Sequence, residues 1–149
     1  MKNHDKLPIL PDDIHPALKE LFGYRLMHAA LKYRKSLLVI LEDFKISPPQ
    51  LTIMRILADS TLLSQANLGK ELGHDKVAMV RFIDGLEKLK YITRVAGNTD
   101  KREKLIDLTK LGKTTLSQIQ KKNVVREEKF LSPLTKIEAQ TLKKLIMKL

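Results

Sequence analysis

The chain has 149 residues, the usual size of one domain, and its 43% hydrophobic and 30% charged residues are typical of a globular protein. Lys and Arg number 28 against 17 Asp and Glu, and the formal net charge of +11 favours a polyanionic partner, either nucleic acid or an anionic membrane. The lack of cysteine excludes disulfides, thiolate metal sites and cysteine nucleophiles, and no apolar run approaches the roughly 20 residues that cross a bilayer.

The first predicted element is a long amphipathic helix over residues 14–45. Its spacing of apolar residues, at steps of three and four, draws one stripe along about eight helical turns. A single helix of this length exceeds what one compact domain needs, so we expect part of the stripe to pack against a second copy of the chain. The stripe consists of Leu18, Phe22, Leu26, Ala29, Tyr33, Leu37, Ile40 and Phe44.

The segment Ser47-Pro48-Pro49 predicts the end of this helix and the start of a second one. Ser47 is suited to the N-cap, and proline is tolerated in the first turn of a helix. We expect this second helix to end near Asp59. Its predicted apolar face is Leu51, Met54, Leu57 and Ala58.

Two further short helices are predicted around the turn of residues 73–75. The first begins after Ser64, whose side-chain oxygen can accept from the N–H of Asn67, and it ends at Gly73. Asp75 then caps the second, and two short helices joined by a three-residue turn form a helix-turn-helix pattern. In this second helix Met79, Ile83, Leu86 and Lys90 share one side, which leaves Lys76, Val77, Ala78, Val80 and Arg81 in its exposed N-terminal half.

A β-hairpin is predicted next, from segments 91–95 and 104–108 with a Gly-Asn turn signal between them. Residues 88–113 carry eight Lys and Arg against three Asp and Glu, so five of the eleven net positive charges lie in this short region. The hairpin therefore coincides with the main concentration of positive charge.

The C-terminal third is predicted to be helical again. One helix runs from Thr109 to about Lys129, and Ser132-Pro133 breaks it. A last helix opens with Thr135-x-x-Glu138, the pattern of a capping box. Its apolar stripe is Leu142, Leu145, Ile146 and Leu149.

Residues 100–112 read Asp100-x-Arg102-x-Lys104-x-x-x-Leu108-Thr109-x-x-Gly112, which resembles the wing signature DxRxKxxxLTxxG of the MarR family at every fixed position. The segments Leu72-Gly73-His74-Asp75-Lys76 and Arg81-x-x-Asp84-x-Leu86-Glu87 resemble the recognition-helix region of that family. The resemblance covers residues 46–112, and the flanking helices match in pattern only. It implies a homodimer, joined by its terminal helices, that binds palindromic DNA and represses or activates transcription.

The predicted fold class is therefore mainly α with a small β-hairpin wing (α+β). The architecture is a winged helix-turn-helix flanked by N- and C-terminal dimerisation helices. We expect one domain over residues 1–149, with dimerisation helices at 14–45 and 110–149 and a DNA-binding lobe at 46–109.

The chain departs from the family in its recognition helix. Val77, Ala78 and Val80 occupy positions at which the family usually carries small hydroxyl residues. Apolar groups in the major groove are suited to thymine methyl groups, and Arg81 can pair with guanine or with a phosphate. We therefore expect an A·T-rich half-site with one readable guanine. An alternative reading places Val77 inward, because a register error of one residue would bury it.

The wing residues have separate expected roles. Asp100 shapes the wing by pairing with Arg102 or by capping the turn, so that Arg102 reaches the minor groove. Lys101 and Lys104 are expected to contact phosphates, which position the protein without specifying sequence. The full candidate DNA-binding set is Ser64, Gln65, Lys76, Val77, Ala78, Val80, Arg81, Lys101, Arg102 and Lys104.

No metal, cofactor or catalytic site is predicted. The four histidines lack the spacing of a zinc site, and no catalytic triad, phosphate loop or carboxylate pair stands out. We therefore expect a protein that is not an enzyme. A small aromatic or amphiphilic anion is a candidate effector, and Arg25, His28 and Lys32 could line its pocket beside the helix of residues 49–58. The alternative is that these three side chains are solvated or pair with acids of the partner chain.

Two other function classes fit the sequence less well. A winged helix can act as a protein-interaction adaptor that does not read DNA, but the presence of both Asp100 and Arg102 argues against it. A membrane-surface protein would carry its basic residues along one amphipathic helix, whereas the strongest cluster here lies on a hairpin. The N-terminal residues show no sustained apolar stretch, and we expect a cytoplasmic protein that binds double-stranded DNA, itself and no membrane.

Overall fold

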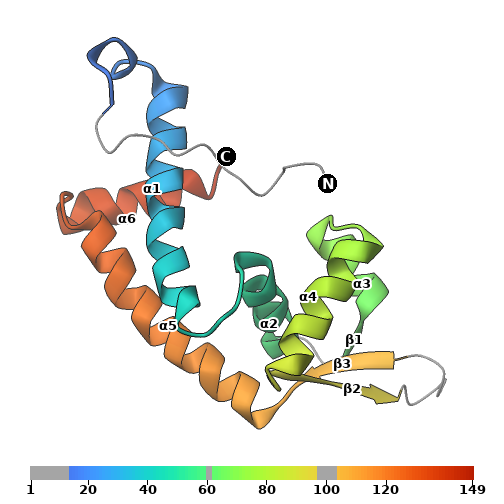
Figure 1. Cartoon of the computed structure of the whole chain (residues 1–149). Helices are drawn as coiled ribbons and strands as arrows, with labels where there is room; N and C mark the ends of the chain where they lie inside the picture. Colours follow the sequence, from blue (N-terminus) through green and yellow to red (C-terminus); the bar gives the residue numbers. More distant parts are fainter. Residues whose placement is uncertain (1–13, 60–61, 97–103) are drawn as a thin grey trace. The chain divides into compact units, whose positions relative to one another are not determined.

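The computed structural model describes residues 14–59, 62–96 and 104–149 (Figure 1). Its backbone groups into two compact units. Among the described residues, the first contains 14–39 together with Arg126–Leu149, and the second contains those between Ile40 and Val125. The single domain predicted over 1–149 remains a prediction. None of the described helices is both long and apolar enough to cross a membrane.

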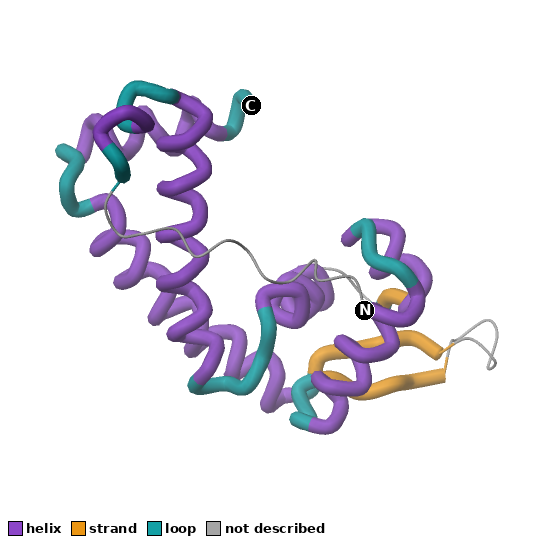
Figure 2. The backbone as a smooth tube through the Cα atoms, turned by 45° about the horizontal axis from the view of Figure 1, so that its top comes forward, coloured by secondary structure: helices purple, strands orange, loops and turns teal. Residues whose placement is uncertain are grey.

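The second unit holds the predicted helix-turn-helix and hairpin. Helix α2 spans Pro48–Asp59, α3 spans Gln65–Leu72 and α4 spans Lys76–Lys88. Strands β1 (Leu63–Ser64), β2 (Ile92–Ala96) and β3 (Lys104–Leu108) form an antiparallel sheet in the order β1-β3-β2, coloured orange in Figure 2. The fold is thus mainly helical with a small sheet, as predicted.

The ends of the helices confirm the capping predictions. The Oγ of Ser64 accepts from the N–H of Asn67 at 3.3 Å, and Gly73 ends α3 with the left-handed φ of 64° that glycine adopts most readily. The Oδ1 of Asp75 accepts from the N–H of Ala78 at 2.8 Å. These local bonds fix where α3 and α4 begin, and they set the three-residue turn between the helices.

The sheet contains one strand that was not predicted. Leu63 pairs with Ile106 and Ser64 with Leu105, so the short β1 covers the edge of β3. On the other edge the hairpin register runs from Ile92 opposite Leu108 to Ala96 opposite Lys104. A two-residue strand has no alternation to detect in sequence, and only the long-range pairing with β3 reveals it.

The apolar core of the described chain lies wholly in the second unit. Ile53 and Met54 of α2, Ile83 and Leu86 of α4, and Ile106 of β3 are at most 1% exposed. The α2 face thus differs from the prediction, because Ile53 is buried whereas Ala58 is exposed. The other buried apolar residues are Leu41, Ile46, Leu51, Leu57, Leu68, Met79, Phe82, Ile92, Leu108 and Ile119.

The first unit is built from the terminal helices. The predicted helix over 14–45 is divided into a 3-10 turn, η1 (Pro16–Leu18), and α1 (Phe22–Glu42). Lys45, with a left-handed φ of 57°, follows α1 and lets the N–H of Ile46 bond back to Leu41 O, so the chain turns before Ser47. The prolines therefore start the next helix but do not themselves end the first.

Helices α5 (Lys110–Leu131) and α6 (Lys136–Ile146) complete the chain. The predicted capping box is present: Thr135 Oγ1 accepts from the N–H of Glu138, and Glu138 Oε2 accepts from the N–H of Thr135. In the first unit, Glu127 of α5 pairs with Lys143 of α6 at 2.5 Å and accepts from the Tyr33 hydroxyl at 3.5 Å. Arg126 lies 3.9 Å over the Tyr33 ring.

Candidate nucleic-acid interface

Helix α4 presents two opposite faces. Met79, Ile83 and Leu86 are at most 1% exposed and fix the inward face of the helix, and Phe82 is 9% exposed. At about 100° per residue, Val77 lies nearly opposite these side chains. It is 80% exposed, and Val80, three residues on, is 40% exposed. The alternative in which Val77 packs inward is therefore wrong.

The other predicted residues of α4 lie at its open N-terminal half. Lys76 and Arg81 are exposed, and Ala78 is half-buried with its N–H capped by Asp75. The guanidinium of Arg81 lies 5.3 Å from the centre of the Phe82 ring. The prediction that Lys90 shares one side of the helix with Met79, Ile83 and Leu86 is wrong. Helix α4 ends at Lys88, and Lys90 is exposed with a left-handed φ of 60° that turns the chain toward β2.

Helix α3 supplies the other predicted contacts. Gln65, its first residue, is half-buried, whereas Ser64 is only 8% exposed. Because the Ser64 Oγ already accepts from the N–H of Asn67, its position favours a role in starting α3 over a side-chain contact with DNA.

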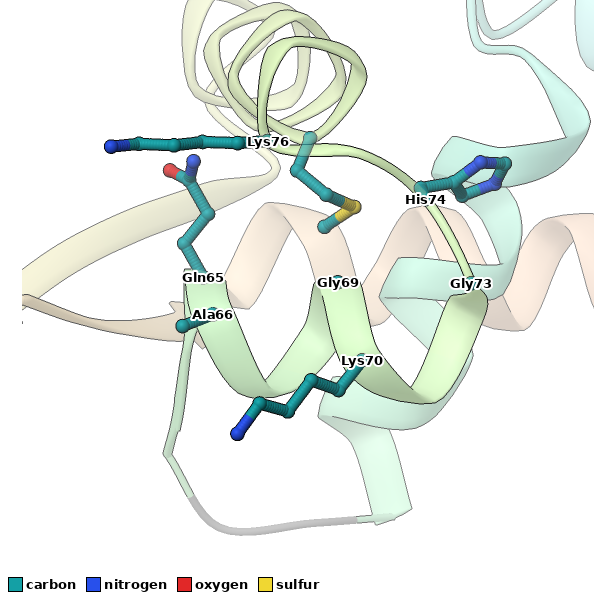
Figure 3. Close-up of a pocket in the computed structure, with 8 residues that line it drawn as sticks. Gln65, Ala66, Gly69, Lys70, Gly73, His74 and Lys76 are labelled. Carbon is teal, nitrogen blue, oxygen red and sulfur yellow. The ribbon is translucent and has the colours of Figure 1, made fainter.

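A cavity of about 550 Å³ lies between α3 and α4 (Figure 3). Met79 and Gly69 form part of its wall, and a Cβ on Gly69 would lie 3.3 Å from the Met79 side chain. In Figure 3 the side chains of Gln65 and Lys76 lie at one end of the cavity, and His74 lies at the other. The two helices therefore meet at a small glycine, and Gln65 and Lys76, the first residues of the two helices, both line the cavity.

Helix α4 is tied to the wing by an arginine that the sequence pattern did not single out as functional. Arg94, on β2, donates from Nη2 to Asp84 Oδ1 at 2.5 Å and from Nη1 to Glu87 Oε2. The Arg94 side chain is 25% exposed. Two carboxylates one helical turn apart, followed by a basic residue in the next strand, were the signal available in the sequence. The contacts couple α4 to the wing.

A second tie joins α4 to α2. Gln50 donates from Nε2 to the Phe82 carbonyl at 3.1 Å, and its Oε1 accepts from the N–H of Ser47 at 2.9 Å. A Cβ on Gly85 would collide with the Gln50 amide nitrogen. Ser47 is thus held by Gln50, and this arrangement replaces the simple N-cap that was predicted for Ser47.

The last part of the wing signature anchors the base of the hairpin. Thr109 Oγ1 donates to Lys90 O at 2.7 Å and accepts from the N–H of Gly112 at 3.0 Å. A Cβ on Gly112 would run into the Tyr91 carbonyl oxygen. Leu108 is 3% exposed. Thr109 and Gly112 therefore hold the start of α5 against Lys90 and Tyr91, just before β2, at a close approach between backbones.

The tip of the wing lies outside the described residues. The roles predicted for Asp100, Lys101 and Arg102 therefore remain predictions. Lys104 opens β3 and is exposed.

The predicted effector residues lie on α1. Arg25 and Lys32 are exposed and His28 is half-buried, and their spacing places them on one side of the helix. The pocket itself remains a prediction. Within the described ranges, no group of three His, Asp or Glu side chains is placed to hold a metal ion.

Comparison with known families identifies the central part of the chain. The MarR family matches residues 46–104, a segment that includes α2, α3, α4 and β2 and ends at the first residue of β3. This range contains the helix-turn-helix segments and the first part of the wing signature on which the sequence resemblance was based. MarR-family transcription regulators are not enzymes, in agreement with the prediction for this chain.

Comparison with solved structures extends the fold to most of the chain. Wild-type MarR from E. coli, in its apo form, is 23% identical with a TM-score of 0.74, and the match covers 91% of this chain and 98% of that one. The repressor CouR, bound to a 23-mer DNA duplex, is 24% identical with a TM-score of 0.76 and coverages of 91% and 97%. PcaV from Streptomyces coelicolor, in complex with its natural ligand, is 18% identical with a TM-score of 0.67 and coverages of 91% and 96%.

Proposed function

Because this chain is a MarR-family winged helix-turn-helix regulator across residues 46–104, we propose that it binds a palindromic DNA operator as a homodimer and represses transcription. The observation that carries this proposal is the open N-terminal half of α4. Lys76, Val77 and Arg81 are exposed there. Asp75 caps this end of α4, and hydrogen bonds join the helix to α2 and to β2. An α-helix presented in this way fits the major groove.

We expect some of the described residues to contact phosphates, which position the protein on DNA, and others to contact base edges, which specify the sequence. We expect Lys76 and Gln65, at the N-terminal ends of α4 and α3, to contact phosphates. Arg81 can pair with the O6 and N7 of guanine, while Val77, Ala78 and Val80 meet apolar base edges. Lys104, Lys101 and Arg102 add contacts from the wing, with Arg102 in the minor groove and Asp100 shaping the turn.

Support for a homodimer comes from the terminal helices. Of the large apolar side chains that are exposed in the described chain, thirteen lie in the first unit and five in the second. The first unit also contributes none of the buried apolar residues found in the described ranges. Apolar helix surface of this extent is expected to be covered by a second copy.

A mobility shift on the DNA upstream of the protein's own gene tests the function. We expect a shifted band that weakens steeply as salt is raised, because phosphate contacts release counterions. Arg102→Ala should lose most of the affinity with an unchanged thermal midpoint, since the wing tip serves DNA and not the core. Lys136→Ala removes one positive charge from α6 and serves as the matched control.

Two outcomes would count against this proposal. Equal affinity of the Arg102→Ala variant and the wild type would remove the wing from the mechanism. Lack of any shift, both on the upstream DNA and on a random duplex library, would contradict DNA reading and favour the protein-interaction adaptor.

We further propose that a small aromatic or amphiphilic anion releases the DNA by binding beside Arg25, His28 and Lys32. Arg25 and Lys32 place two cations on the same side of α1 as His28. A ligand can shift the equilibrium only if it prefers one spacing of the recognition helices. Salicylate at millimolar concentration should release the operator, and Arg25→Ala should blunt the release without changing ligand-free affinity. An unchanged response in Arg25→Ala and His28→Ala would refute the pocket.

A further inference from the structure

The exposed face of α4 carries an unusual pair of side chains for a DNA-reading helix. Val77 and Val80, which we call the valine pair, lie three residues apart and therefore on the same side of the helix. They are 80% and 40% exposed. Isolated exposed valines are ordinary on protein surfaces, but these two lie between the exposed cations Lys76 and Arg81 at the end of the helix that faces DNA in the proposed function.

Contacts on the buried face of α4 and at its N-terminal end fix the orientation of the valine pair. Met79 and Ile83 are at most 1% exposed, so α4 cannot rotate about its axis without withdrawing them from the core. Asp75 caps the N-terminal end of α4, and the Gln50 amide bonds to the Phe82 carbonyl. The side that carries Val77 is therefore held outward by contacts that do not involve Val77 itself.

The chemistry of valine limits what the pair can read. Its side chain has no hydrogen-bond donor or acceptor, so it cannot distinguish the donor and acceptor patterns of the bases. The one apolar group that the bases expose in the major groove is the C5-methyl of thymine. A methyl group at the same position of cytosine, as in 5-methylcytosine, presents the same surface.

We propose that the valine pair makes this regulator a reader of 5-methylpyrimidines, with Val77 as the specificity-determining residue. The inference rests on the proposed DNA-binding function and adds the chemical group that is read. Removing one contacted methyl should weaken binding about fourfold, because this ratio of affinities corresponds to the free energy of burying one such group.

The test replaces thymine by deoxyuridine, which lacks only the methyl group. An operator is first selected from a random duplex library with the full-length protein. Each thymine of one half-site is then replaced in turn by deoxyuridine, and affinities are measured by fluorescence anisotropy. At the same positions, deoxycytidine is compared with 5-methyldeoxycytidine, which isolates the methyl group in a second base.

Val77→Ala and Val80→Ala are the matched protein variants. Because Val77 is 80% exposed and alanine favours helices, the Val77→Ala variant should keep the wild-type thermal midpoint. The wild type should lose about fourfold on deoxyuridine at one or more positions, whereas Val77→Ala should lose less than twofold at the position that its side chain contacts. The wild type should also bind 5-methyldeoxycytidine more tightly than deoxycytidine there.

Several results would overturn the inference while leaving DNA binding intact. They are equal wild-type affinity for thymine and deoxyuridine at every position, an unchanged deoxyuridine penalty in both valine variants, or a selected half-site without thymine. A protein that selects no duplex at all refutes the proposed function, and the inference fails with it.

Discussion

Arg94 on β2 is paired with Asp84 on α4, with the guanidinium Nη2 2.5 Å from the carboxylate Oδ1. The other nitrogen, Nη1, pairs with Glu87 one turn further along the same helix. The wing strand and the proposed recognition helix are thereby joined by one side chain. These contacts add to the packing of the core in holding their relative position, on which simultaneous contact with two grooves would depend.

Replacing Arg94 with methionine should destabilise the protein and lower its affinity for DNA. The variant removes the cation and leaves two carboxylates close together on α4, at a cost of about 1 kcal/mol because the group is partly exposed. The thermal midpoint should fall by roughly 2–4 °C. High salt should shrink the difference from the wild type because it screens both the attraction and the repulsion.

A charge-matched control for Arg94 is available in the same unit. Lys122 pairs with Asp43 at 2.5 Å, but its side chain is 49% exposed and it contacts a single carboxylate. Lys122→Met should change the midpoint less than Arg94→Met. A larger effect of the Lys122 change would contradict a special role for Arg94.

Gly112→Ala should be strongly destabilising. Its added Cβ would meet the backbone oxygen of Tyr91, and a backbone group cannot move aside as a side chain can. We expect a loss of about 2–3 kcal/mol in the free energy of unfolding, measured by urea denaturation. Gly23→Ala is the control, because a Cβ at Gly23 meets nothing within 4 Å and should stabilise α1 slightly.

The pair between Glu127 and Lys143 should make stability depend on pH at both ends of the scale. The hydrogen bond from Lys143 holds the pKa of the Glu127 carboxyl below its ordinary value of 4.5, and the same bond raises the pKa of Lys143 above 10.5. The Glu127 contribution is present above pH 4.5 and is lost as the pH falls through its lowered pKa. The Lys143 contribution is present below pH 10.5 and is lost as the pH rises through its raised pKa.

Urea denaturation across pH checks this dependence. Glu127→Gln should be less stable than the wild type near pH 7, and the difference should vanish in strong acid, where the wild-type carboxyl is also neutral. Lys143→Met should show the same deficit near pH 7. A Glu127→Gln deficit that persists unchanged in strong acid would show that lost packing, and not charge, causes it.

Sedimentation should give about twice the chain mass of 17.1 kDa, because the terminal helices leave apolar surface uncovered. Ile146→Glu places a charge on α6 at a side chain that is 52% exposed, and it should shift the protein toward monomer. Val77→Glu makes the comparable change on the exposed face of α4 and should leave the mass unchanged. A wild-type monomer at micromolar concentration would contradict the proposed interface.

Features that depend on neighbours along the chain could be predicted before the structure was known. Ser64, Asp75 and the Thr135–Glu138 pair bond to backbone groups three residues away, and Gly73 supplies its own left-handed turn. Spacing alone is enough to predict such contacts. The signature at residues 100–112 likewise indicates the wing through the identity and spacing of its residues.

Features that join distant segments could be recognised only in the folded chain. Arg94 pairs with Asp84 and Glu87, which lie ten and seven residues earlier in the chain. Gln50 bonds to the Phe82 carbonyl, and β1 is a strand only because it pairs with β3. The outward orientation of Val77 also follows only from the folded chain, because burial of Met79 and Ile83 fixes the rotation of α4. A periodic pattern specifies which residues share a helix face, but only the packing of that helix against the rest of the chain specifies which face is covered.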